Sequence, residues 1–241
     1  MDTKTSIAEN YSDLLQEIGR LSREAGRDPA EIRLVVVTKG HPLEPVQEVV
    51  TAGARWLGEN YLEEALPKME ALGAENRVEW HMIGHVQSRK AEAVAGHFAW
   101  VHSVDRIKIA DRLNRFAGEI GRRLPVLLEC NVSGEESKYG WKAWREADWP
   151  ALVEAFSPLV SLPNLDVRGL MTMAPYFDEP EPARPYFQRL RRLRDYLAGA
   201  IPGPYWQELS MGMSGDFPVA IQEGATILRI GTRIMGPRPE I

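Results

Sequence analysis

Lys39 is the side chain whose position most suggests reactivity, because it ends the apolar run 33–39 with its three consecutive valines. If this run is a β-strand, alternation places Val35, Val37 and Lys39 on the same face. An amine at the edge of an apolar pocket loses hydration, so its pKa should fall and its neutral form should become more populated. A neutral amine can attack an aldehyde to form a Schiff base. A solvated lysine at a strand end is the alternative that this segment alone favours.

Two segments near the end of the sequence could bind a phosphate group. Ser210, Gly212 and Ser214 belong to the segment that joins a predicted strand to a helix expected to begin near residue 215. Glycine lets the backbone approach a ligand, Ser214 could cap the helix, and a helix N-terminus offers free N–H groups to an anion. Gly231 and Thr232 follow the last predicted strand and could form the opposite wall, as the loops after strands seven and eight often do in α/β barrels.

The first of these segments also carries a carboxylate that would oppose phosphate binding. Asp216 falls in the first turn of the expected helix, where its charge would repel a phosphate. We therefore expect its side chain to turn away, for instance toward another backbone N–H. A capped turn without a ligand is the alternative interpretation of residues 210–216.

Arg229 is expected to point into the mouth of a barrel, since alternation would send Leu228 and Ile230 outward. A buried guanidinium must find acceptors, and the nitrogen of a pyridine ring is one candidate. Because a guanidinium only donates, that nitrogen would be unprotonated, and the ring would be a weak electron sink. This argues against vigorous transaminase chemistry. A structural ion pair with Glu59 or Glu129 is the alternative.

Other polar residues give weaker indications. His81 lies inside a predicted strand. It is expected to be a structural residue held by hydrogen bonds, and the alternative is that its ring stacks on a flat ligand. Lys138 lies in a polar loop and could approach the site or be solvated. The arginines of residues 189–194 alternate with a leucine stripe, which predicts a solvated helix face. Cys130 should be a small core residue, and five histidines and one cysteine match no metal-ligand spacing, so no metal site is expected.

The elements that must position these residues alternate along the chain. An amphipathic helix is predicted first, from Ile7 to Leu21. Eight strands are then predicted, at 33–39, 56–59, 78–84, 100–104, 124–132, 166–173, 208–213 and 227–231. Helices are expected between them, near 42–53, 60–74, 86–97, 105–122, 147–160, 181–199 and 215–224.

This alternation predicts an α/β protein with a single (β/α)₈ TIM-type barrel and an extra N-terminal helix. The strands are nearly continuous apolar runs, as in parallel sheets that are covered on both faces. An open doubly wound sheet is the alternative fold, but no Gly-x-Gly-x-x-Gly follows the first strand. Residues 133–149 form a polar loop after the fifth strand, and loops at this end of a barrel usually serve function.

Composition limits the classes of function. The 241 residues, 44% of them hydrophobic and 26% charged, suit one folded barrel domain over 1–241. The net charge of −5 gives no sign of a nucleic-acid or acidic-membrane partner. The N-terminus lacks the apolar run of a signal peptide, and a single cysteine suits a reducing compartment, so we expect a cytoplasmic protein. No heptad seam or large apolar helix face stands out, so we expect a monomer.

Taken in order, the motifs resemble those of the pyridoxal phosphate homeostasis family, single-domain relatives of the alanine racemase N-terminal barrel. They are Val-Val-Thr-Lys at 36–39, Gly-Glu-Asn at 58–60, Trp-His-Met-Ile-Gly at 80–84, Gln-Ser-Arg-Lys at 87–90, His-Ser-Val-Asp at 102–105, Asn-Val at 131–132, Ser-Lys at 137–138, Gly-Leu-Met-Thr-Met at 169–173, Leu-Ser-Met-Gly-Met-Ser at 209–214 and Arg-Ile-Gly-Thr at 229–232. Each motif alone is weak, but the ordered set covers nearly the whole chain.

The resemblance implies a role for each site residue. Lys39 would carry pyridoxal 5′-phosphate (PLP) as an internal aldimine, and Arg229 would face the ring nitrogen. Lys138 would match a second lysine that the family uses in PLP exchange. The remaining contacts fall into two groups: Ser210, Ser214, Gly231 and Thr232, with Gly212 among them, would bind the phosphate, and Asn60, His81, Ser103 and Met171 would line the ring.

Three functions remain open from the sequence. The favoured one is a PLP carrier and regulator without robust turnover and without catalytic residues, with PLP-dependent apoenzymes as possible recipients. The second is an amino-acid racemase, which needs two bases. In alanine racemase the second base is a tyrosine of a C-terminal β domain, which we do not expect in this chain because only nine residues follow Thr232. The third is a barrel enzyme for a small phosphorylated metabolite.

Overall fold

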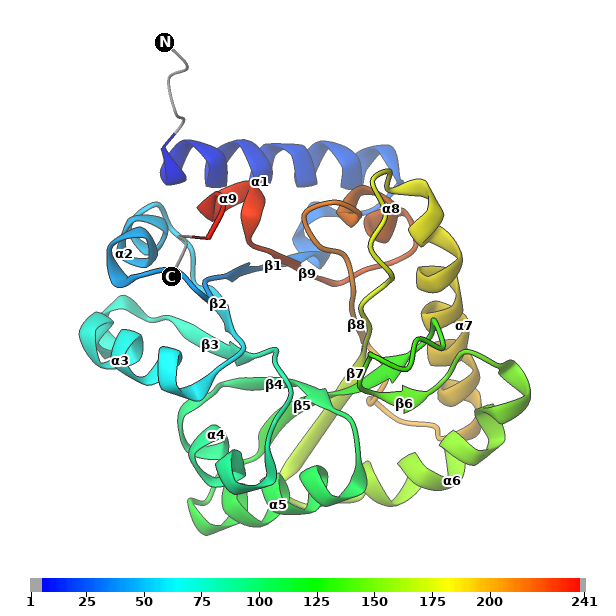
Figure 1. The fold of residues 1–241 in the computed structure, drawn as a ribbon. Helices are drawn as coiled ribbons and strands as arrows, with labels where there is room; N and C mark the ends of the chain where they lie inside the picture. Colours follow the sequence, from blue (N-terminus) through cyan, green and yellow to red (C-terminus); the bar gives the residue numbers. More distant parts are fainter. Residues whose placement is uncertain (1–5, 239–241) are drawn as a thin grey trace.

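The computed structural model, which describes residues 6–238, shows a closed barrel of parallel strands (Figure 1). The barrel strands are β1 (Arg33–Val37), β2 (Trp56–Glu59), β3 (Glu79–Met82), β4 (Trp100–Val104), β5 (Leu124–Asn131), β7 (Leu165–Met171), β8 (Glu208–Ser210) and β9 (Ile227–Ile230). Pairing of β1 with β9 and of β4 with β5 closes the ring. The predicted barrel and its eight strands are therefore confirmed.

Helices surround the barrel in the order that the sequence predicts. They are α1 (Ile7–Glu24), α2 (Leu43–Thr51), α3 (Leu62–Leu72), α4 (Ala91–His97), α5 (Ile107–Glu119), α6 (Trp149–Leu159), α7 (Arg184–Ala200), α8 (Phe217–Gln222) and α9 (Thr232–Met235). The short α9 and the two-residue strand β6 (Trp141–Lys142), which pairs with β5 inside the polar loop, were not predicted. Within residues 6–238, no helix is both long and apolar enough to cross a membrane.

The extra helix α1 covers the place where the chain closes on itself. Its buried stripe contains Tyr11, Leu14 and Ile18, and it packs against α9, α8 and α2 (Figure 1). Polar contacts join α1 to α9: Glu17 pairs with Arg233 at 2.7 Å, and Asn10 donates to the Ile234 carbonyl at 3.2 Å. The first and last helices of the described chain therefore stabilise each other.

Strand alternation divides the core into two parts. The larger part lies between the strands and the helices, and it includes Leu34, Val36, Leu228 and Ile230. The smaller part fills the barrel interior and contains Val35, Trp100, Leu127, Met171 and Ile227. Neighbours in sequence therefore face opposite sides of the barrel wall. Polar residues at inward positions must lie above, below or among the interior group.

Gly169 in β7 makes the closest backbone approach within the sheet. Its φ is +157°, and a Cβ atom there would lie 1.9 Å from the carbonyl oxygen of Glu208 in the neighbouring strand β8. We expect Gly169→Ala to force β7 and β8 apart and to lower the free energy of unfolding by about 1–3 kcal/mol or more. Urea unfolding followed by circular dichroism measures this change.

Gly96→Ala is the matched control for that experiment. Gly96 lies in α4, is exposed, and has no atom within 4 Å of its would-be Cβ. Alanine there should stabilise the helix by roughly 0.5–1 kcal/mol. Equal unfolding free energies for the two variants would contradict the proposed clash at Gly169.

Candidate functional site

A cavity of about 700 Å³ opens where the barrel strands end. Such carboxyl ends form the active sites of (β/α)₈ barrels. Six of the residues predicted from the sequence lie in its wall. Lys39, Asn60, Gly231 and Thr232 follow strands, Arg229 lies inside β9, and Ser214 lies in the loop after β8. The structure thus brings together the lysine, the arginine and both proposed phosphate segments in one cavity.

The Lys39 amine lies in this cavity two residues beyond β1. Burial lowers its pKa, and the nearby positive charges of Arg238 and Arg229 lower it further, while Glu59 opposes the shift. Val35 belongs to the barrel interior and Val37 lines the cavity, so the predicted inward row is confirmed. Among the residues that the structure describes, none forms a hydrogen bond or ion pair with the amine. The amine is therefore both poorly hydrated and free to react.

Arg229 enters the barrel mouth as its alternation predicts, and its exposure is only 4%. Its guanidinium donates to the Ser210 hydroxyl at 2.6 Å and to the Thr172 carbonyl at 2.8 Å. Burial lowers its pKa to about 10, against the opposing effect of Asp216 and Glu129, so it stays charged at neutral pH. Two of its five N–H groups donate these hydrogen bonds, and the guanidinium has further N–H groups that could donate to a ligand in the cavity.

The alternative in which Arg229 pairs with Glu59 is wrong. Lys68 and Thr38 engage the Glu59 carboxylate at 2.6 and 2.7 Å. Burial raises the pKa of Glu59, and the hydrogen bond from Lys68 opposes that shift. This ion pair fixes α3 against β2, so Glu59 has a structural role beside the site.

Glu129 is a cavity residue, although the sequence suggested it only as a possible ion-pair partner of Arg229. It occupies the inward position after Leu127 in β5, lines the cavity and is 4% exposed. Burial raises its pKa to about 7, the negative charge of Asp105 adds to the shift, and Arg229 opposes it. No ion pair joins it to Arg229, so the second ion-pair alternative is not realised. An acidic residue within an apolar strand was the signal that could have identified it.

The loop after β8 forms one wall of the cavity. The backbone N–H of Met213 donates to the Asp216 carboxylate at 2.6 Å, so the prediction that Asp216 turns toward a backbone N–H is confirmed. The helix α8 begins later than predicted, at Phe217, and its N-cap is Asp216 instead of Ser214. The expected Ser214 cap is therefore wrong. The N–H groups of Ser214 and Gly215 find no acceptor in the chain from residue 6 to residue 238, although both residues line the cavity.

Five of the predicted site residues lie behind or beneath the cavity wall instead of on it: His81, Ser103, Met171, Ser210 and Gly212. Met171 belongs to the apolar barrel interior, and Met173 lines the cavity in its place. The Ser103 hydroxyl donates to the Gly84 carbonyl at 2.6 Å. His81 and Ser210 belong to a buried hydrogen-bonded chain that leads to Arg229. These five residues do not line the cavity in this structure, and their contacts with a ligand stay predictions.

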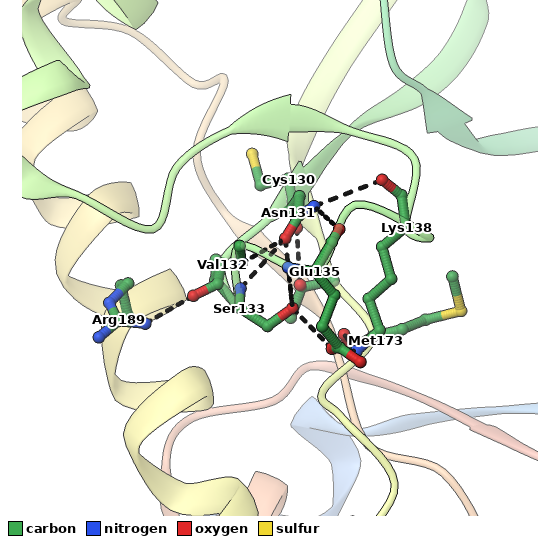
Figure 2. A network of polar contacts seen from close by, with 10 residues as sticks. Cys130, Asn131, Val132, Ser133, Glu135, Lys138, Met173 and Arg189 are labelled. Atoms are coloured by element: carbon green, nitrogen blue, oxygen red, sulfur yellow. Dashed lines mark hydrogen bonds and ion pairs between the residues drawn. The ribbon is translucent and has the colours of Figure 1, made fainter.

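Figure 2 shows how the loop after β5 surrounds Asn131 and brings Lys138 beside Met173. The Asn131 carboxamide accepts from the N–H of Gly134 at 2.9 Å and donates to the Glu135 carbonyl at 2.9 Å, which folds the loop around it. Lys138 donates to the carbonyl of Met173 at 3.2 Å and pairs with Glu135. Since Met173 lines the cavity, Lys138 lies beside the cavity wall with its ammonium already engaged.

Comparison with known proteins places this site in a family. The family model for the alanine racemase N-terminal domain matches residues 10–239. A pyridoxal phosphate homeostasis protein from Pseudomonas aeruginosa is 44% identical over 234 residues, covering 97% of this chain and 96% of the relative. The structure of PipY from Synechococcus elongatus with PLP bound has a TM-score of 0.75 at 35% identity, covering 91% of this chain and 99% of that one.

A more distant similarity concerns the fold alone. Alanine racemase from Clostridium difficile has a TM-score of 0.65 at 14% identity, and the match covers 95% of this chain but 58% of that enzyme.

The raised pKa of Glu129 predicts a pH dependence of stability. Its folded pKa of about 7 lies above the ordinary 4.5, so the folded state binds this proton more tightly than the unfolded state. The resulting stability is fully present below the unfolded pKa and is lost as pH rises through the folded pKa. Glu129→Gln should remove this loss, which amounts to about 3 kcal/mol at most between about pH 5 and about pH 8. Urea unfolding at several pH values measures it.

Glu179→Gln serves as the control, because Glu179 lines the same cavity but is exposed. It should leave the pH profile of the wild type unchanged. Parallel profiles for wild type and Glu129→Gln would show that Glu129 ionises normally in the folded protein.

Proposed function

Since this chain belongs to the pyridoxal phosphate homeostasis family, we propose that it binds PLP covalently through Lys39 and serves intracellular PLP homeostasis without robust turnover. The observation that best supports this proposal concerns the Lys39 amine, which is poorly hydrated and has no hydrogen-bond partner among residues 6–238. It shares a cavity with a buried arginine and with two backbone N–H groups that have no acceptor among these residues. PLP supplies an aldehyde that condenses with a neutral primary amine to form an imine and release one water.

The residues of the cavity fit the shape and charge of PLP. We assign its phosphate to the loop after β8 and to the segment after β9, where Ser214, Gly231 and Thr232 line the wall. The free N–H groups of Ser214 and Gly215 can donate to phosphate oxygens, and the turned Asp216 carboxylate is already occupied by Met213. Asn60 and Met173 then border the ring, and the charged Arg229 donates to the ring nitrogen.

The chemistry of Arg229 argues against vigorous transaminase-type turnover. A guanidinium that keeps its proton leaves the ring nitrogen unprotonated, and such a ring accepts electrons weakly. The named Pseudomonas relative matches this chain over 96% of its own length, and its name describes homeostasis instead of racemisation. The similarity to alanine racemase is too distant to argue for its activity.

An amino-acid racemase is the second candidate, and one observation favours it. Racemisation needs a second acid–base group besides the lysine, and Glu129 is a cavity carboxylate with a pKa of about 7. Racemase activity in the pure protein that disappears in both Lys39→Ala and Glu129→Gln would establish this candidate and overturn the carrier proposal.

We further propose that the protein acts as a cytoplasmic monomer and that PLP-dependent apoenzymes receive its cofactor. The buried, reduced Cys130 and the acidic net charge are consistent with this setting. Lys138 lies beside the cavity through its contact with Met173, where a departing aldehyde could meet a second amine.

Borohydride trapping tests the attachment site directly. The purified protein is mixed with PLP, reduced with borohydride, digested and analysed by mass spectrometry. We expect the protein to turn yellow on mixing with PLP and, after reduction, to carry one label, on Lys39, because burial lowers the pKa of this amine and leaves more of it neutral. Lys39→Ala should lose the label and the colour.

Lys90→Ala is the control, since Lys90 also lines the cavity but pairs with Glu63 at 2.6 Å. It should bind PLP as the wild type does. Label spread over several surface lysines, or no colour at all, would overturn the proposal and leave a phosphate-binding barrel of other chemistry.

A further inference from the structure

A chain of polar side chains crosses the interior of the barrel beneath the cavity. His81 Nδ1 lies 2.9 Å from His102 Nε2, and His102 Nδ1 lies 3.0 Å from the Ser210 hydroxyl. Arg229 donates to the same hydroxyl at 2.6 Å. The four residues come from β3, β4, β8 and β9, and all are buried. We call them the interior polar chain; of its members, Arg229 lines the cavity.

Arg229 determines how the hydrogens of this chain are arranged. Because a guanidinium can only donate, the Ser210 oxygen accepts from it, and the hydroxyl hydrogen is left for His102 Nδ1. His102 then carries its hydrogen on Nε2 and donates to His81 Nδ1. This order leaves one group unpaired, the N–H at His81 Nε2. The opposite order would leave two, the Ser210 hydrogen and His81 Nε2.

Both imidazoles are neutral in this arrangement. Burial lowers the pKa of His81 to about 3. Burial also lowers the pKa of His102 far below its ordinary value, and electrostatic interactions with the neighbouring His81 and with the positively charged Arg229 add to that shift. The positive charge of the chain therefore stays on Arg229, at the cavity end.

The other end of the chain is closed. His81 stacks on Trp100 with their ring planes 3° apart, and the Arg33 guanidinium covers the Trp100 ring at 5.1 Å. The Nε2 atom of His81 is buried and has no hydrogen-bond partner among residues 6–238. A proton entering from the cavity would find no exit there, so the geometry supports a role in holding Arg229 instead of conducting protons.

We propose that Ser210 and His102 are positioning residues, which act through Arg229 to aim its guanidinium at the ring nitrogen of the bound ligand. The proposal rests on PLP binding in the cavity. It gives Ser210 a role different from phosphate contact: its oxygen is taken by Arg229, and its hydrogen by His102. Ser210 pairs in register with Met171 and Ile227, which lie in the apolar barrel interior below the cavity.

Two ligands distinguish a positioning role of Ser210 from a direct contact of Ser210 with the phosphate. They are PLP and pyridoxal, which has the same ring and aldehyde but no phosphate. If Ser210 acts through Arg229, Ser210→Ala should weaken both ligands by a similar factor, roughly 10-fold for the loss of one charge-assisted hydrogen bond. The absorption maximum of bound PLP should also shift, because the donor at the ring nitrogen has moved. Ser210→Thr, which keeps the hydroxyl, should restore both properties.

Ser22→Ala controls for the general cost of losing a buried hydroxyl. The Ser22 hydroxyl is buried and donates to the Ile18 carbonyl at 2.6 Å inside α1. Its loss should lower stability without changing affinity or spectrum. A loss of PLP affinity in Ser210→Ala with unchanged affinity for pyridoxal would overturn the proposal, because that is the signature of a phosphate contact.

Imidazole nitrogen chemical shifts test the chain without any ligand. In protein labelled with ¹⁵N-histidine, His102 should be neutral with its hydrogen on Nε2 from about pH 5 to about pH 8, since its pKa lies well below that range. Ser210→Ala should change this tautomer, and His102→Gln identifies the signal. A His102 that titrates near its ordinary value of 6.5, or that carries its hydrogen on Nδ1, would overturn the arrangement. Failure of the wild type to bind PLP would refute the proposed function while these shifts still report on the chain.

Discussion

The permanent positive charge of Arg229, whose side chain is only 4% exposed inside the barrel, constrains the residues around it. Such a charge is tolerated only where acceptors replace the lost water. Ser210 and the Thr172 carbonyl supply contacts, and Glu129 and Asp216 supply negative charge from farther away. After burial and the charge of Arg238, the same charge further lowers the pKa of Lys39. Arg229 therefore connects the reactive amine, the loop after β8 and the barrel interior through one electrostatic field.

The fold and the outline of the cavity could be predicted because they depend on local patterns. Apolar runs of strand length, separated by amphipathic stretches, specify a barrel that is covered on both faces. Alternation within single strands placed Lys39 and Arg229 correctly, since one face of each strand must be inward. The turn of Asp216 followed from charge alone, because an exposed carboxylate would have blocked an anion site.

The depth of each residue along the barrel axis could not be predicted in the same way. It depends on how neighbouring strands are staggered, which sequence alternation does not specify. The strand predicted over 208–213 ends at Ser210. Because Ser210 pairs in register with Met171 and Ile227, it lies at their level in the barrel interior instead of at the mouth. His102 was passed over for a related reason: its partners come from other strands. The helix α8 starts only at Phe217, and the Asp216 carboxylate turns back to accept from the Met213 N–H.

The contact of α1 with α9 has a consequence for how the protein is made. The first helix packs on the last, and β1 completes the barrel only when β9 pairs with it. During synthesis on the ribosome, β1 therefore keeps an open edge until β9 has emerged, and such edges invite chaperone binding. Gly231 and Thr232, on the proposed phosphate wall, emerge only after β9. A chain that has not yet added β9 and the residues after it thus lacks part of the proposed phosphate wall, so loading with PLP would follow synthesis of that segment.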